Sequence, residues 1–304
     1  MTVEGEKNMK HYWAKVVAPS EEIGISLTTN LRSKCRFKIN ECYFTTYKAA
    51  FNEFYDCDFF RIDLITQNDR KNAERIMNRA IDLLSYITNA PYELDELEED
   101  SNINITPINI NSRKIENLKE INDQYKRIRR KKELLENTLR MYSLALKYDM
   151  LLGDCEESFF ILFRIIEKIA KDEFRIEKES IDIRKSDMRT IIKRIIEKSY
   201  GIKMTSEKLD SFAGKLSNKL FNDVFSEVYS IIAWFCRKKN IKYDENVLSK
   251  AVSIRNRLAH GEYVHIDSWS EEYNLVRYLA NMCIRKKFFR NIQHWYLKVD
   301  ISSY

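Results

Sequence analysis

Three polar residues late in the sequence, Arg255, Asn256 and His260, have the types and spacing that cleavage of a phosphodiester bond requires. An arginine offers a planar fork of N–H donors that matches a phosphate group. A histidine, whose unperturbed pKa is about 6.5, can accept and return a proton at neutral pH. The pair suits a reaction in which the substrate supplies the nucleophile, and RNA carries one in its ribose 2′-hydroxyl. These residues therefore predict chemistry on RNA.

The stretch that carries them is predicted to be the end of an amphipathic helix. Apolar residues recur at helical spacing through residues 247–258, and Gly261 is of the type that commonly ends a helix. Asn256 lies four residues before His260 and shares its face. Arg255 falls at the edge of the apolar stripe, where a charge must be paired or face a cleft.

An earlier helix supplies a candidate partner for that charge. In the stretch FFILFRIIEKIA, Glu167 lies four residues after Phe163 and three before Ala170, so it borders the apolar face. A carboxylate there would pair with Arg255 and orient it. The alternative is that Arg255 and Glu167 form only an ion pair between helices, and that His260 only ends its helix. The residues alone leave both interpretations open.

Length and composition limit the class of protein. The chain has 304 residues, enough for one large or two ordinary domains, and its six Gly and three Pro predict long regular elements. It has no apolar run long enough to cross a membrane, and residues 1–13 lack the apolar core of a secretory signal. Six scattered cysteines without CxxC spacing predict reduced core thiols. We therefore expect a cytoplasmic protein that is not attached to a membrane.

The net charge of +6 is unevenly distributed. Residues 1–100 contain 13 Lys and Arg against 18 Asp and Glu, whereas residues 101–304 contain 39 against 28. A basic second part favours an acidic partner, most commonly nucleic acid. A solvated lysine-rich surface explains the same numbers, so charge alone does not decide between the two.

The pattern along the chain predicts an α+β N-terminal domain followed by an all-α helical bundle, mainly α overall. We assign residues 1–91 to the small α+β domain, 92–112 to a linker and 113–304 to the bundle. Runs rich in β-branched and aromatic residues predict strands, and periodic apolar residues predict helices. The expected strands are 11–18, 23–27, 35–51 and 58–66, and the expected helices are 67–91, 112–150, 154–174, 186–201, 220–240, the helix ending at 260, and 268–289.

Motifs for cofactor chemistry are missing from the sequence. It contains no GxxxxGK[ST], no GxGxxG after a strand, no HExxH and no GxSxG, and its four histidines are too few for a His-rich metal site. We therefore expect an enzyme that uses neither a nucleotide cofactor nor a metal.

The Arg255–Asn256–x3–His260 motif late in a helical bundle, with Glu167 on an earlier helix, resembles the HEPN superfamily of prokaryotic defence and toxin proteins. The resemblance covers roughly residues 130–290, and residues 1–91 resemble no domain that we can name. It implies a bundle that dimerises and brings two Arg–His pairs into one cleft. It also implies metal-independent RNA cleavage that leaves a 2′,3′-cyclic phosphate and a 5′-hydroxyl.

The same resemblance assigns roles and partners. One His260 would act as base on the 2′-hydroxyl, the other would protonate the leaving oxygen, and Arg255 would stabilise charge on the phosphate. The implied partners are RNA, a second copy of the chain, and an antitoxin or another defence-system protein. Some members of the family are not nucleases and serve as RNA-binding or assembly modules, which is the alternative function for this chain.

Further RNA-binding residues are predicted on and after the motif. Arg257 either contacts the RNA backbone or faces solvent, and Tyr263 either binds phosphate or packs. Three basic runs, 126–132, 237–242 and 285–290, are candidates for an RNA track. From the last run we select Arg285, Lys286 and Lys287, while the adjacent Phe288 and Phe289 stack on bases or, as we favour, pack in the core.

Overall fold

A computed structural model of the chain describes residues 9–17, 36–47, 59–100, 116–153, 155–199, 205–262, 264 and 269–289. The chain divides into two compact units. The first comprises Met1–Leu162 with Ile284–Tyr304, and the second comprises Phe163–Cys283. Two helices, α5 (Glu156–Ile176) and α10 (Ser270–Phe288), contribute residues to both units.

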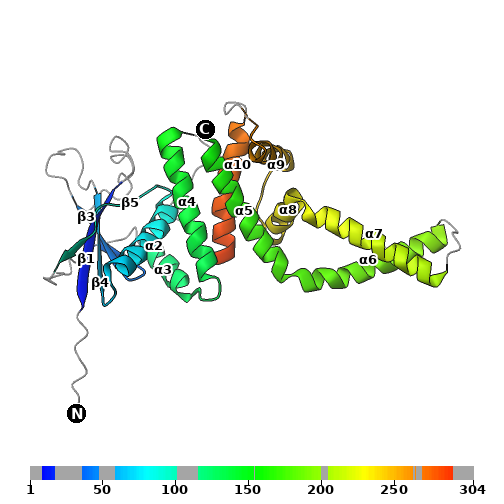
Figure 1. The fold of residues 1–304 in the computed structure, drawn as a ribbon, viewed down its shortest axis with the longest axis horizontal. Helices are drawn as coiled ribbons and strands as arrows, with labels where there is room; N and C mark the ends of the chain where they lie inside the picture. Colours follow the sequence, from blue (N-terminus) through cyan, green and yellow to red (C-terminus); the bar gives the residue numbers. More distant parts are fainter. Residues whose placement is uncertain are drawn as a thin grey trace, which may run out of the picture. The chain divides into compact units, whose positions relative to one another are not determined.

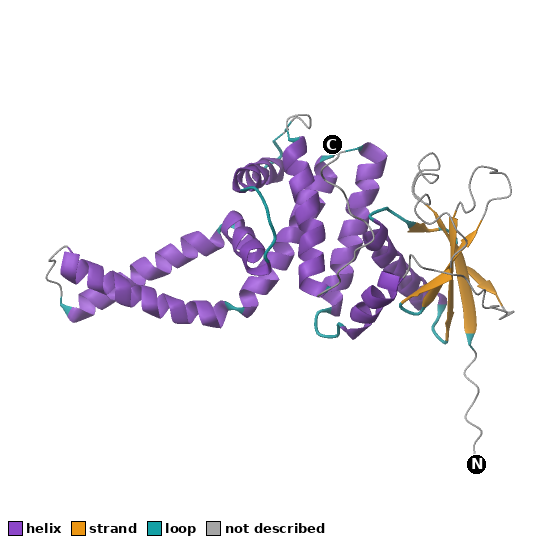
Figure 2. Ribbon diagram, turned by 180° about the vertical axis from the view of Figure 1, so that it is seen from behind, coloured by secondary structure: helices purple, strands orange, loops and turns teal. Residues whose placement is uncertain are grey.

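The first unit contains an antiparallel sheet in the order β2-β3-β4-β1-β5, with β6 also paired to β1 (Figures 1 and 2). Along β1, alternate residues Tyr12, Ala14 and Val16 are buried, as expected for a strand with one face on the core. The strands are β1 (Lys10–Val17), β2 (Arg36–Ile39), β3 (Cys42–Tyr47), β4 (Phe59–Thr66), β5 (Glu93–Leu94) and β6 (Glu98–Asp100).

Helix α2 (Arg70–Thr88) packs against this sheet. Its N-terminus is capped by Asp69, whose carboxylate accepts a hydrogen bond from the backbone N–H of Asn72 at 2.8 Å. Its buried face includes Ala73, Met77 and Leu84. The sequence predicted this helix because apolar residues recur with the helical period, and that prediction is confirmed.

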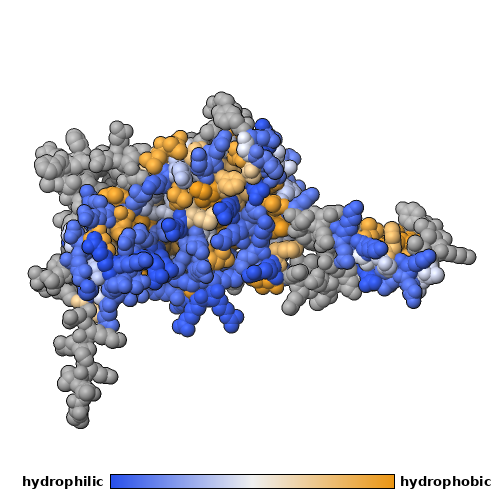
Figure 3. Space-filling model, viewed as in Figure 1, coloured by the Kyte–Doolittle hydropathy of each residue, from blue (hydrophilic) through white to orange (hydrophobic). Residues whose placement is uncertain are grey.

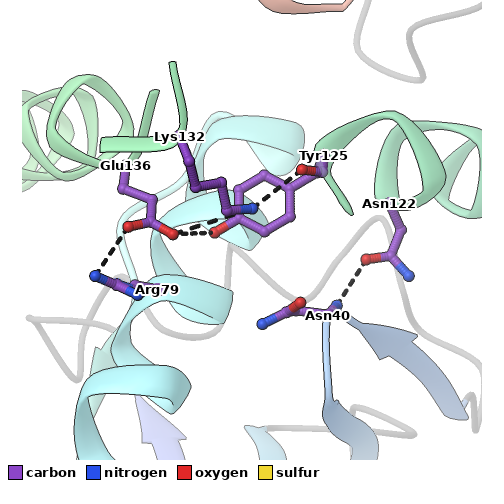
Figure 4. Close-up of polar contacts among 6 residues, drawn as sticks. All are labelled: Asn40, Arg79, Asn122, Tyr125, Lys132 and Glu136. Carbon is purple, nitrogen blue, oxygen red and sulfur yellow. Dashed lines mark hydrogen bonds and ion pairs between the residues drawn. The ribbon is translucent and has the colours of Figure 1, made fainter. Parts of the chain in front are cut away.

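Two further helices of the first unit, α3 (Glu116–Arg127) and α4 (Lys132–Leu152), are joined to α2 by a polar network around Glu136 (Figure 4). Arg79 of α2 bonds one oxygen of Glu136 at 2.9 Å, and the hydroxyl of Tyr125 donates to the other at 3.4 Å. Lys132 lies over the Tyr125 ring and donates to the Tyr125 carbonyl oxygen at 3.0 Å. Burial lowers the pKa of Lys132 to about 8, although Glu136 opposes this shift. We call these four residues the Glu136 network.

The turn between β2 and β3 is tied to α3. Asn40 adopts a left-handed conformation, with a φ of 54°, which asparagine tolerates better than most residues. Its backbone N–H donates to the side-chain oxygen of the buried Asn122 at 2.6 Å (Figure 4). The sheet and the helices of this unit are therefore linked by specific hydrogen bonds as well as by apolar packing.

The second unit is entirely helical over its described residues. It is built from the C-terminal part of α5 and most of α10, together with α6 (Lys178–Ser199), α7 (Ser206–Ser226), α8 (Val228–Lys239) and α9 (Glu245–Ala259). Helices α6 and α7 lie along one another (Figure 1). The edge-to-face rings of Phe174 and Trp234 join α5 to α8, and an ion pair between Lys250 and Glu272 joins α9 to α10.

The α6–α7 pair also carries exposed apolar side chains. Ile191 and Ile195 are about half exposed on α6, and so is Phe212 on α7. Figure 3 shows apolar residues among hydrophilic ones on this pair. Charged groups hold the two helices together, since Arg189 and Lys193 of α6 both contact Asp210 of α7.

The predicted fold class is confirmed: an antiparallel sheet with a helix comes first and a mainly helical part follows. Several predicted elements differ in detail. The expected helix 186–201 begins earlier, at Lys178 in α6, and residues 206–219 of α7 were not predicted to be helical. The expected strand 35–51 is a hairpin, because the chain reverses at Asn40 between β2 and β3. The expected helix 112–150 is two helices, α3 and α4, and the expected helix 220–240 is divided at Glu227 into α7 and α8. The expected strand 23–27 lies outside the described residues.

Part of the predicted linker is built into the sheet. Residues 93–94 and 98–100 form β5 and β6, which pair with β1, while residues 101–112 lie outside the described part of the chain. The acidic composition suggested a linker, but short edge strands are often rich in charge. The division into domains at 1–91, 92–112 and 113–304 stays a prediction, because a compact unit is not necessarily an independently folding domain.

The described cysteines agree with the expected core thiols. Cys42, Cys155, Cys236 and Cys283 are buried and free, and burial raises the pKa of each thiol. They are therefore uncharged at neutral pH. Cys35 and Cys57 lie outside the described residues.

Candidate active site

Helix α9 carries the candidate site and has well-defined ends. The carboxylate of Asp244 caps its N-terminus by accepting from the backbone N–H groups of Asn246 and Val247 at 2.8 and 3.1 Å. At the other end, Gly261 has a φ of 76° and the backbone N–H of Glu262 returns to the carbonyl oxygen of Arg257. The predicted helix end at the His-Gly pair is confirmed.

Arg255 makes the contact that the sequence predicted. Its Nη2 donates to Oε2 of Glu167 at 2.9 Å, and its Nη1 donates to the side-chain oxygen of Asn256 at 3.1 Å. The side chain of Glu167 is 13% exposed and that of Arg255 is 25% exposed. The pair therefore lies at the edge of the core, with one side open to solvent.

Glu167 binds a second cation from its own helix. Its Oε1 accepts a hydrogen bond from Nζ of Lys171, four residues later on α5. One carboxylate is thus shared by two positive side chains, which leaves a formal charge of +1. We call Glu167, Lys171, Arg255 and Asn256 the Glu167 cluster.

The guanidinium of Arg255 keeps capacity for a ligand. It has five N–H donors, of which Glu167 and Asn256 use two. The remaining three have no partner among the residues that the structure describes. An arginine that is oriented by a carboxylate and retains free donors can bind a phosphate oxygen.

His260 lies at the C-terminal end of α9 and is exposed. Its backbone N–H donates to the carbonyl oxygens of Asn256 and Arg257, which fixes the main chain at this position. Within the described parts of the chain, no residue forms a hydrogen bond or an ion pair with its ring. It comes five positions after Arg255, or about 7.5 Å farther along the helix axis. The structure therefore places both residues on one helix without bringing them into contact.

The structure locates most of the predicted RNA-binding residues, and their role stays a prediction. Arg257 pairs with Glu262 at 2.9 Å, and both side chains are about half exposed. Tyr263 lies outside the described residues. Arg285, Lys286 and Lys287 end α10 and belong to the first unit.

Base stacking by the two phenylalanines of the last basic run is not supported. Phe288 is 7% exposed and Phe289 is 2% exposed, so both pack in the core, as we favoured. The middle basic run is also largely neutralised by its neighbours. Its Lys238 and Lys239 pair with Glu173 of α5, and Arg237 pairs with Glu245.

Our reading of contiguous runs missed four exposed basic residues on α5. Arg164, Lys168, Lys171 and Arg175 are separated by four, three and four residues, so they lie on one face of the helix. The helical period, applied to charged rather than apolar residues, would have identified them. We call these four residues the α5 basic stripe.

A second polar cluster lies on the sheet of the first unit. Nε2 of the buried His11 is 2.9 Å from Oδ1 of Asp63, and Arg61 bonds the same oxygen at 2.9 Å. Arg61 also lies over the ring of Trp13. The burial of His11 agrees with a structural role.

Two kinds of site are absent from the described residues. No group of three or more His, Cys, Asp or Glu there could hold a metal ion, and no helix there is long and apolar enough to cross a membrane. No known family, curated protein or solved structure matches the chain. The functional argument therefore rests on the residues of the site and on the resemblance in the motif.

Proposed function

We propose that this protein is an endoribonuclease that cleaves RNA without a metal ion through Arg255 and His260. The observation that carries the proposal is the pairing of Arg255 with Glu167, which orients a guanidinium of which three N–H donors have no partner among the described residues. A purely structural ion pair between helices would not need these N–H donors to be left for a ligand. The exposed His260 at the end of the same helix supplies a group that can move a proton.

The chemistry follows from these two groups and the substrate. The 2′-oxygen of a ribose attacks the adjacent phosphorus while an imidazole of His260 removes its proton. The bond from phosphorus to the 5′-oxygen breaks, and that oxygen takes a proton from a second His260. Arg255 stabilises the negative charge that grows on the phosphate. The products are a 2′,3′-cyclic phosphate and a 5′-hydroxyl.

The need for two imidazoles leads to a dimer. One His260 cannot act on both sides of the phosphate in a single step, so a second copy of the chain provides the other. This arrangement is the one that the HEPN resemblance implies, and the proposal includes a role in a prokaryotic antiviral defence or toxin system. An antitoxin or a defence-system protein would then control its activity.

Paired arginine-to-lysine substitutions test the proposal. Arg255→Lys keeps the charge but loses the planar fork, so cleavage should fall by roughly 100-fold. Arg194→Lys is the matched control, because Arg194 is an exposed arginine of α6 in the same unit and is not a predicted RNA contact. It should change cleavage by less than about threefold. Equal effects of the two substitutions would contradict a special role for Arg255.

One observation favours a second function, a non-catalytic RNA-binding or assembly module. No described residue holds the ring of His260, whereas a catalytic imidazole usually has a partner that sets its tautomer. RNA binding without cleavage by the wild-type dimer would establish this alternative.

A further inference from the structure

The α5 basic stripe has a regular geometry. Its four residues, Arg164, Lys168, Lys171 and Arg175, span eleven helical positions, or roughly 16 Å along the axis. Neighbouring charges are about 4.5–6 Å apart along that axis. The buried residues Ile166 and Ile169 and their neighbours occupy the opposite face of α5, so the stripe faces away from the core.

The charges of the stripe are available to a ligand. Arg164 and Lys168 are exposed and form no ion pair with any residue in the described ranges. The side chain of Lys171 is 52% exposed and that of Arg175 is 82% exposed. Among the described residues, Arg175 pairs with Asp172 alone, at 3.8 Å, which is a weak surface contact.

Other lysines close to α5 in the fold show the contrast. Lys238 and Lys239 of α8 are 27% and 17% exposed, and both pair with Glu173. Their charge is cancelled at the protein surface. On the outward face of α5, by contrast, Arg164 and Lys168 have no carboxylate partner among the described residues.

The stripe is joined to the candidate active site through the carboxylate of Glu167. Lys171 belongs to the stripe and bonds one oxygen of Glu167, while Arg255 bonds the other oxygen. Lys171 and Arg255 are therefore both bonded to Glu167, so an anion bound at Lys171 lies close to Arg255.

We propose that the α5 basic stripe binds the sugar-phosphate backbone of single-stranded RNA and leads it to Arg255. This inference rests on the proposed function for the identity of the polyanion. A row of separate charges fits an extended polyanion better than a single phosphate, because each cation can neutralise a successive group. All four residues of the stripe are arginine or lysine, and none is an aromatic residue or an amide. We therefore predict that binding does not depend on the base sequence.

Two triple substitutions in the full chain test this assignment. Arg164→Gln, Lys168→Gln and Arg175→Gln together remove three charges and leave Lys171 bonded to Glu167. The control is Lys208→Gln, Lys215→Gln and Lys219→Gln, which removes three charges from exposed lysines of α7. Binding of a fluorescent 2′-O-methyl RNA, which cannot be cleaved through its 2′-oxygen, is measured by anisotropy between 50 and 200 mM salt.

The stripe variant should bind about tenfold more weakly, and the slope of log Kd against log salt should fall by about 2 units, or 0.7 for each lost phosphate contact. The α7 control should stay within about twofold of wild type. An equal loss in both variants, or no loss in the stripe variant, would overturn the inference. Stripe-dependent binding of polyglutamate as tight as that of RNA would also overturn it, in favour of an acidic protein. The single Lys168→Glu variant repeats the test if the triple variant fails to fold.

Parallel assays with cleavable RNA separate this inference from the proposed function. If wild type cleaves RNA while the stripe variant binds normally, the stripe assignment alone fails. If wild type does not cleave but the stripe variant loses binding, the ribonuclease proposal alone fails and the RNA track stands.

Discussion

Two glutamates in different units make almost the same ion-pair pattern. Glu136 in the first unit and Glu167 in the second are 12% and 13% exposed, and each lies between an arginine from another helix and a lysine four residues away on its own helix. They differ in what surrounds the lysine. Lys132 lies on the Tyr125 ring and donates to a backbone carbonyl, whereas Lys171 is half exposed and belongs to a row of cations.

This difference teaches that an ion pair does not identify a functional site by itself. The Glu136 network joins α2, α3 and α4 and includes Tyr125. Burial and the nearby carboxyl groups of Glu136 and Asp82 raise the pKa of this tyrosine. The Glu167 cluster joins two helices and is continuous with uncompensated positive charge and with the helix that ends at His260. We therefore expect substitutions in the first to change stability and substitutions in the second to change RNA binding and cleavage.

The largest change in stability is expected for Glu136→Ala. It leaves Arg79 and the desolvated Lys132 without their carboxylate. Both cations are partly exposed, so the free energy of unfolding should fall by about 2 kcal/mol, below the roughly 3–5 kcal/mol of a fully buried pair. Urea denaturation measures the loss. An unchanged midpoint would show that the network does not hold the helices together.

A pH-dependent effect is expected at Asp82. Burial raises the pKa of this carboxyl from 3.8 to about 7, although Arg140 and Ser143 favour its ionised form. Between about pH 4 and 7 the folded state keeps a proton that the unfolded state has released, so this group lowers stability as pH rises through that window. Asp82→Asn should remove that contribution. Urea denaturation at several pH values should show a smaller decline for the variant than for wild type, and parallel curves would contradict the assignment.

Asn122→Ala should have a smaller effect on stability. The backbone N–H of Asn40 loses its acceptor, which costs about 1 kcal/mol of unfolding free energy. Asn122→Asp keeps an acceptor oxygen and should lose less. If both substitutions cost the same in urea denaturation, the hydrogen bond is not the reason for the burial of Asn122.

The smallest change in stability is expected for Glu167→Ala, although its effect on activity is large. Arg255 and Lys171 can both turn toward solvent, so the unfolding free energy should fall by about 1 kcal/mol or less. Cleavage should slow by roughly tenfold to 100-fold because Arg255 loses the group that orients it. A large stability loss with unchanged specific activity would make Glu167 a structural residue like Glu136.

The sequence predicted the parts of the site that follow from helical periodicity. Arg255 and Glu167 border apolar stripes, and for that reason their contact was foreseeable before the fold was known. Helix α9 ends before Gly261 as predicted, because local backbone chemistry determines caps. The fold class followed from the change of apolar period along the chain.

Features that depend on packing between distant residues were not predictable. The break at Glu227 between α7 and α8 has no glycine or proline, so nothing local marks it. In the sequence, Lys238 and Lys239 belong to a basic run that suggests RNA binding. In the fold, both pair with Glu173 of α5, which no local pattern indicates. The strands β5 and β6 are too short for a periodic signal and form because β1 offers them an edge.

The central claim is tested most directly by the fate of one RNA in EDTA with wild-type protein and His260→Ala. The account predicts that wild type cleaves the RNA to a 2′,3′-cyclic phosphate and a 5′-hydroxyl, and leaves the 2′-O-methyl form of the same sequence intact. It predicts that His260→Ala binds the RNA as tightly as wild type and cleaves it at least roughly 100-fold more slowly. Cleavage that requires Mg²⁺, or full activity in His260→Ala, would contradict the account.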